Sequence, residues 1–127
     1  LMDNAVCRNQ TVDCCSIPCR KISIAGICNW GYYSEDFILK FTDGSESKLY
    51  ATFADWIFPF DKQAEYESER GREFNLEKHR VLASFNTNGP EVVLSYSTAD
   101  FGKTRLLDKL MFPDNIFMNV FAVTLEG

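Results

Sequence analysis

The chain has 127 residues, which fits a single domain that is large enough to bury a core. Hydrophobic residues make up 46% of the sequence and aromatic residues 14%, so disorder is excluded as the main state. Eighteen acidic residues stand against 13 lysines and arginines, for a net charge of −5, which argues against a nucleic-acid-binding protein. No apolar run reaches the roughly 18 residues of a membrane span, so we expect no such span.

Residues 1–20 form a cysteine-rich segment, which we expect to pack on a domain made by residues 21–127. The five cysteines are Cys7, Cys14, Cys15, Cys19 and Cys28. This clustering favours a disulfide-stapled segment over a zinc site, because only one pair has zinc-like spacing; free thiols are the third alternative. The odd number means that one thiol stays free or bridges to another chain, which would give a homodimer.

A glycosylation sequon lies within the same segment, at Asn9-Gln10-Thr11. A sequon by itself is weak, because such triplets occur by chance. Together with the clustered cysteines it predicts an extracellular glycoprotein with Asn9 as the acceptor.

The rest of the chain is typical of short strands separated by turns. We expect strands at residues 22–27, 37–41, 48–53, 80–85, 92–96, 105–111 and 116–125. Asp43-Gly44 predicts a hairpin turn, Asn88-Gly89-Pro90 a break, and residues 113–115 another turn. The spacing of these strands predicts an all-β protein, a β-sandwich.

Two stretches in the middle of the chain have alternative interpretations. Residues 61–73 are crowded with charge, which indicates a solvated loop or an exposed helical turn, or else the polar rim of a binding face. Residues 56–60 hold Trp56 and two phenylalanines, for which core packing or a surface patch is expected. His79, the single histidine, is interpreted as an ordinary surface or core residue.

Three pieces of the chain look familiar as a set. They are the strand and turn at residues 41–45 (Phe-Thr-Asp-Gly-Ser), the pair Asp55-Trp56, and residues 110–115 followed by the last strand at 116–125. Together they resemble the galactose-binding-like jelly rolls that occur as carbohydrate-binding modules, over about residues 21–127. The resemblance implies a jelly roll, a carbohydrate ligand and one structural calcium ion near the sandwich edge. Asp43 and Glu126, with Asp36 as a further donor, would supply the oxygen ligands that calcium requires.

The strongest candidate binding site is the stretch from residue 29 to residue 36. Sugar sites need aromatic rings for the apolar sugar face and fixed polar groups for the hydroxyls. This stretch supplies both, with Asn29, Trp30, Tyr32, Tyr33, Glu35 and Asp36. The alternative is that Trp30 and one tyrosine pack onto the end of the sandwich.

The sequence therefore predicts a secreted, non-catalytic, lectin-like module whose partner is a carbohydrate or glycoprotein. The alternative is a secreted structural or adhesion protein that acts through protein contacts, as a disulfide-linked dimer. A calcium-dependent lipid-binding sandwich is a third hypothesis, which the acidic balance disfavours. We expect no enzyme, because the sequence has no Gly-x-Ser-x-Gly, no His-Glu-x-x-His and no phosphate-binding glycine loop.

Overall fold

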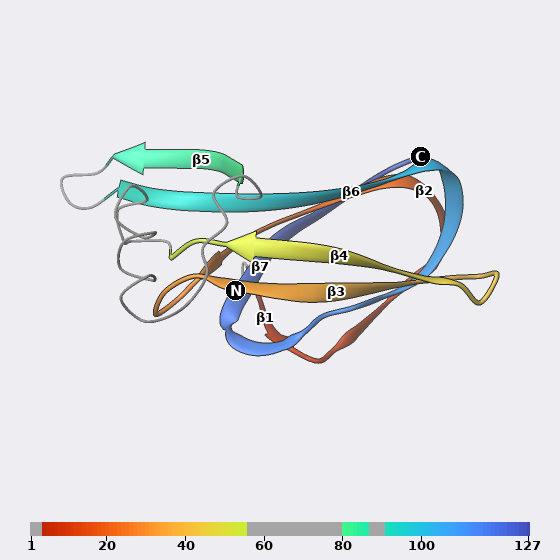
Figure 1. The fold of residues 1–127 in the computed structure, drawn as a ribbon, viewed down its shortest axis with the longest axis horizontal. Helices are drawn as coiled ribbons and strands as arrows, with labels where there is room; N and C mark the ends of the chain where they lie inside the picture. Colours follow the sequence, from red (N-terminus) through yellow and green to blue (C-terminus); the bar gives the residue numbers. More distant parts are fainter. Residues whose placement is uncertain (1–3, 56–79, 87–90) are drawn as a thin grey trace.

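The computed structural model describes residues 4–55, 80–86 and 91–127, and within these ranges no helix is present. The strands are β1 (Ala5–Arg8), β2 (Thr11–Cys28), β3 (Tyr33–Phe41), β4 (Glu46–Phe53), β5 (Arg80–Asn86), β6 (Glu91–Met111) and β7 (Asp114–Glu126) (Figure 1). The predicted all-β class is confirmed. The predictions for residues 56–79, with Trp56, the charged stretch and His79, and for the break at 88–90 lie outside the described residues.

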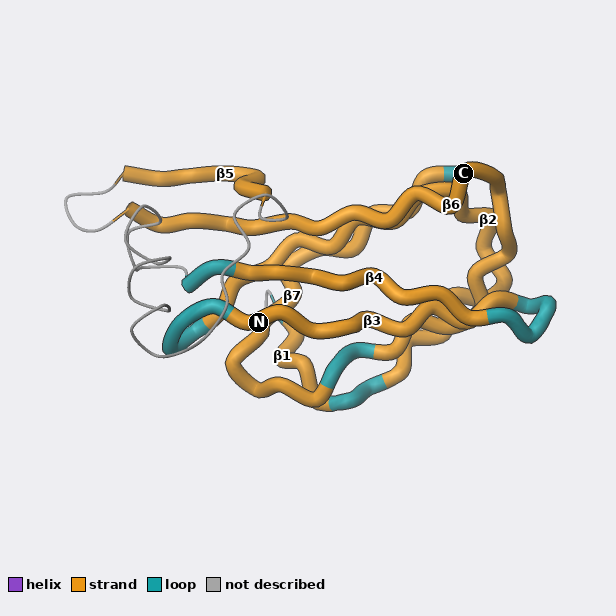
Figure 2. The backbone as a smooth tube through the Cα atoms, viewed as in Figure 1, coloured by secondary structure: helices purple, strands orange, loops and turns teal. Residues whose placement is uncertain are grey.

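All described strands belong to one antiparallel sheet, in the order β1-β7-β2-β6-β3-β4, with β5 also paired to β6. The sheet curls on itself as a half-barrel, whose backbone is drawn in Figure 2. The structure does not show the two stacked sheets of the predicted sandwich or jelly roll. The long strands β2 and β6 bend at irregularities in their pairing. Because of these bends, one continuous sheet can curl around the core.

Strand ends differ from the sequence prediction mainly where pairing overrides local breakers. The predicted strands at 92–96 and 105–111 are parts of β6, which continues through Gly102 with a positive φ of 75°. Here the residues between Asp100 and Arg105 bulge out opposite Arg20. Likewise, β2 begins at Thr11, so the expected domain boundary at residue 21 falls inside a strand.

The core lies on the concave side of the curl and follows the alternation of the strands. It is formed by side chains such as Ile22 and Ile24 of β2, Phe37 and Leu39 of β3, and Phe53 of β4. Gly26 continues the inward series of β2 without a side chain. A Cβ there would lie 2.2 Å from the Asn119 carbonyl oxygen and 2.5 Å from the Phe53 ring, so only glycine lets that ring lie on the β2 backbone.

Side-chain hydroxyls help to close the curl where β4 approaches β6. The Thr52 N–H donates to Ser97 Oγ at 3.2 Å, and the Ala54 N–H donates to Ser95 Oγ at 3.1 Å. Just beyond, the Cys28 N–H donates to the Ala54 carbonyl oxygen at 2.9 Å. These bonds satisfy the buried main-chain N–H groups of Thr52 in β4, of Ala54 just after it and of Cys28 at the end of β2.

The cysteine-rich segment is part of the sheet, as β1 and the first half of β2. All five cysteines lie in the described residues, and no disulfide bond joins any of them. The predicted disulfide staple is therefore not present in the structure. Cys7, Cys19 and Cys28 are core residues, where a cysteine packs as a small hydrophobic side chain, whereas Cys15 is exposed on an irregular part of β2.

Candidate functional site

The connection between β2 and β3, residues 29–32, is here called the Trp30 loop. It presents Trp30 to solvent with 78% of the residue exposed. Trp30 adopts a positive φ of 64°, a left-handed conformation that residues other than glycine rarely adopt, and Gly31 follows with a φ of 110°. The indole, the largest ring in the described structure, is therefore exposed at the surface on a residue with left-handed backbone conformation.

Two hydrogen bonds hold the Trp30 loop from either side. The Asn29 N–H donates to the Phe117 carbonyl oxygen at 2.8 Å, and the Gly31 N–H donates to Asp55 Oδ2 at 2.8 Å. Asp55 lies just after β4 and is only 9% exposed. In the sequence, Asp55 is noted only as part of the pair Asp55-Trp56 in the family resemblance, whereas in the structure it anchors the Trp30 loop.

The wall beside the loop combines residues of β3 and β7, which are not neighbours in the sheet. The rings of Tyr33 and Phe117 stack with their centroids 5.4 Å apart and an interplanar angle of 14°. Asn115 Nδ2 donates to Glu35 Oε1 at 3.2 Å. We call Asn29, Trp30, Tyr33, Glu35, Asn115 and Phe117 the Trp30 site; its members are linked by the Tyr33–Phe117 stack, the Asn115–Glu35 hydrogen bond and the bond from the Asn29 N–H to Phe117.

Sequence reasoning missed the contribution of β7 to this site. Asn115 and Phe117 lie at a break in the pairing of β7 with β1, where the register jumps from Asn115 to Asn119 and the Phe117 N–H donates to Asn115 Oδ1 at 3.0 Å. Nothing in the sequence indicated this irregularity, or that the curl would bring β7 against β3.

The other two predicted binding residues lie elsewhere. Tyr32 is buried, with 4% exposed, so its ring is not available to a surface ligand. Asp36 alternates with Glu35 and therefore points to the opposite face of β3, where it pairs with Lys48 at 3.7 Å. The predicted cluster is thus divided between two faces and the core.

Cys7 is a buried thiol near the site. Burial, with a smaller contribution from the nearby Glu35 carboxylate, raises the pKa of Cys7 to about 12. The thiol is therefore protonated at neutral pH, and a protonated thiol is a poor nucleophile. The groups of the Trp30 site can engage a ligand by ring stacking and hydrogen bonding.

The predicted calcium ligands are placed apart from the Trp30 site. Asp43 Oδ1 accepts from the Ser45 N–H at 2.9 Å and from the Ser45 hydroxyl, and these bonds lower the pKa of the Asp43 carboxyl. Glu126 ends β7 opposite Lys21. Among the described residues there is no group of three metal-ligating side chains that could hold an ion, so calcium stays a prediction.

The predicted glycosylation site is exposed. Asn9 follows β1 with a positive φ of 60°, and its N–H donates to the Pro113 carbonyl oxygen at 3.1 Å. The turn between β1 and β2 therefore presents Asn9 at the surface, where a glycan can be attached.

The chain does not match any protein-family model or any curated protein sequence. The resemblance to galactose-binding-like jelly rolls therefore stays a prediction. In the part of the chain that the structure describes, no helix is long and apolar enough to cross a membrane.

Proposed function

We propose that the protein is a secreted, non-catalytic module that binds carbohydrate at the Trp30 site. The observation that carries this proposal is the state of Trp30, which is 78% exposed and held in a left-handed conformation by bonds on both sides. A left-handed residue other than glycine costs on the order of 1–3 kcal/mol, and such costs cluster at ligand sites. Because the ring is mostly exposed, its packing in the unliganded protein offsets little of this cost.

The groups of the Trp30 site fit a sugar. The indole offers a flat apolar surface for the C–H face of a pyranose ring. Glu35 and Asn115 can accept from and donate to sugar hydroxyls, and their mutual hydrogen bond orients them in advance. The Glu35 carboxylate favours neutral sugars over acidic ones, because a second carboxylate nearby would be repelled.

The proposal is tested by calorimetric titration with a panel of neutral mono- and oligosaccharides. We expect saturable binding that Trp30→Ala weakens at least tenfold, or about 1.4 kcal/mol, and that Trp30→Phe retains in part. Tyr50→Ala is the matched control, because Tyr50 is a 52% exposed aromatic residue on β4, outside the Trp30 site. Equal binding by wild type and Trp30→Ala, or no binding to any saccharide, would contradict the proposal. Repeating the titration with a chelator tests the predicted calcium.

The second candidate function is adhesion through a disulfide-linked dimer. It is favoured by one observation: Cys15 is the exposed member of the five cysteines. The neighbouring Asp13 carboxylate raises the pKa of Cys15, which slows its oxidation at neutral pH. Non-reducing electrophoresis of wild type and Cys15→Ser, with Cys14→Ser as the control, distinguishes a Cys15-linked dimer from a monomer.

A further inference from the structure

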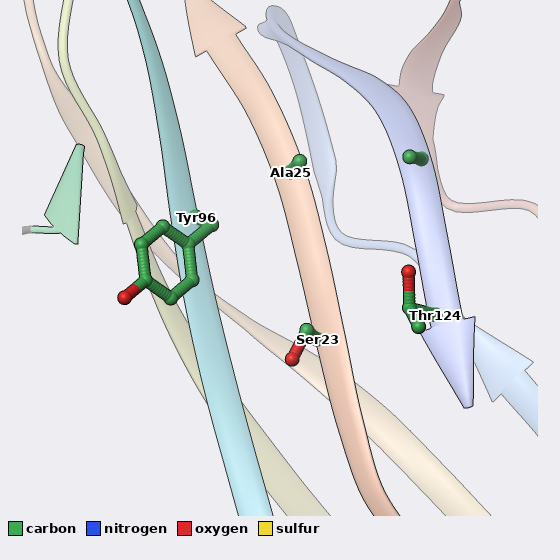
Figure 3. Close-up of a pocket in the computed structure, with 5 residues that line it drawn as sticks. Ser23, Ala25, Tyr96 and Thr124 are labelled. Carbon is green, nitrogen blue, oxygen red and sulfur yellow. The ribbon is translucent and has the colours of Figure 1, made fainter. Parts of the chain in front are cut away.

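The outer face of the β6-β2-β7 part of the sheet carries a groove that is separate from the Trp30 site. Its volume is about 220 Å³, and it is lined by Ser23, Ala25, Tyr96, Ala122 and Thr124 (Figure 3). On β2, Ser23 and Ala25 alternate with the core residues Ile22 and Ile24, so the groove opens on the side of the sheet away from the core.

The pairing of the three strands arranges the groove in two rows. In one row, the lining residues Ser23 and Thr124 are direct partners, and Thr98, which is not one of the lining residues, pairs with Ser23 from the other side. The Ser23 and Thr98 hydroxyls share a hydrogen bond of 2.9 Å. In the second row, Tyr96, Ala25 and Ala122 are partners, which sets one aromatic ring beside two methyl groups.

We propose that this groove is a second saccharide site that takes one neutral pyranose unit. The Tyr96 ring and the two methyl groups match the apolar face of the sugar, and the row of hydroxyls matches its edge. Hydroxyl groups both donate and accept, so they suit sugar hydroxyls in either sense. The lining side chains carry no charge, which gives no partner to an ionic ligand.

The size of the groove limits the ligand. Its volume is below the roughly 300–1,000 Å³ of sites for drug-sized molecules, which leaves room for a single ring. A site this open should bind weakly by itself, with a Kd on the order of 1 mM. A weak second contact is useful to a module that binds a polymer, because linked sites raise the overall affinity.

Amide-resolved NMR titration tests the proposal with the methyl glycosides of glucose, galactose and mannose. We expect saturable shifts at Ser23, Ala25, Tyr96 and Thr124 with at least one glycoside. Ala122→Leu should fill the groove, so that the affinity fitted from these shifts falls at least tenfold. Tyr96→Phe, which keeps the ring, should retain them.

The same titration in Trp30→Ala separates the two sites. Groove shifts that persist in Trp30→Ala support the second site even if the Trp30 site binds no sugar. Shifts confined to the Trp30 loop, groove shifts that Ala122→Leu leaves unchanged, or no shift with any of the three glycosides would overturn it. The spectra also report whether each variant is folded, so loss of binding is distinguished from unfolding.

Discussion

The two connections at the ends of β3 both include a residue with positive φ, but they place different residue types there. The Trp30 loop precedes β3, and the hairpin turn of residues 42–45 follows it, at opposite ends of the strand (Figure 1). Each is held by an aspartate carboxylate that accepts from one of its main-chain N–H groups: Asp55, which follows β4, accepts from Gly31, and Asp43 accepts from Ser45. Each also contains a left-handed residue, which is Trp30 in the loop and Gly44 in the turn.

The difference between them lies in what the left-handed conformation costs each residue. Glycine at position 44 adopts its φ of 85° without steric cost, as a hairpin turn ordinarily requires. Trp30 adopts a φ of 64° at a cost that glycine would avoid, while its ring remains in solvent. Backbone stability favours the residue found at position 44 and not the one found at position 30; under the proposed function, the conformation of Trp30 holds the indole ready for a ligand.

The largest expected difference in stability between the two connections comes from replacing the aspartates that hold them. Asp55→Ala removes a nearly buried acceptor from the Gly31 N–H, and we expect it to lower the free energy of unfolding by about 1–3 kcal/mol. Asp43→Ala affects an exposed carboxylate and should cost clearly less. Urea unfolding of both variants at neutral pH measures the difference.

Asp55→Asn is the matched control, because it keeps an oxygen acceptor in place and should recover much of the loss. Saccharide binding should fall with Asp55→Ala and stay unchanged with Asp43→Ala. Equal destabilisation by the two alanine variants would show that the Trp30 loop is no more firmly anchored than the hairpin turn.

The hairpin turn was predictable from the sequence because its signals are local. Asp43-Gly44 between two apolar runs is enough to predict the pairing of β3 with β4, and the structure confirms it. The continuity of β6 was not predictable in the same way. Gly102 resembles a strand end, and only pairing with β2, which is distant in the sequence, carries the strand through it.

The candidate site was predictable only in part, for a similar reason. An aromatic stretch between strands is visible in the sequence, and Trp30 stands out in the structure as the exposed residue within it. The division of Glu35 from Asp36 follows from strand alternation once β3 is placed. The contributions of Asp55 and Phe117 depend on the curl of the sheet, which no local pattern specifies.

A second prediction exchanges the left-handed residues of the two connections. Trp30→Gly should raise the free energy of unfolding by roughly 0.5–1 kcal/mol, because relief of the backbone cost exceeds the added entropy of the unfolded chain. Gly44→Ala should lower it by a similar amount. A Cβ at Gly44 would meet nothing within 4 Å, so this variant tests the backbone alone.

Thermal unfolding measures the stability of both variants, and saccharide titration measures their binding. We expect Trp30→Gly to gain stability and lose binding, whereas Gly44→Ala loses stability and keeps binding. A loss of stability in Trp30→Gly would mean that the indole contributes to packing, so that the left-handed conformation of Trp30 would no longer point to a ligand.

The smallest effect concerns the pH dependence of the hairpin turn. The Ser45 hydroxyl and N–H, with a further contribution from Arg105, hold the pKa of Asp43 below its ordinary value. A lowered pKa in the folded state means that the contribution to stability is present above the ordinary value of about 3.9 and is lost as pH falls through the folded value. NMR titration of the Asp43 carboxyl should therefore give a lowered midpoint, and Ser45→Ala should raise it, because the hydroxyl is the first cause of the shift. An unchanged midpoint in Ser45→Ala would rule out the hydroxyl as the first cause and assign the shift to the Ser45 N–H and Arg105, which the variant leaves in place.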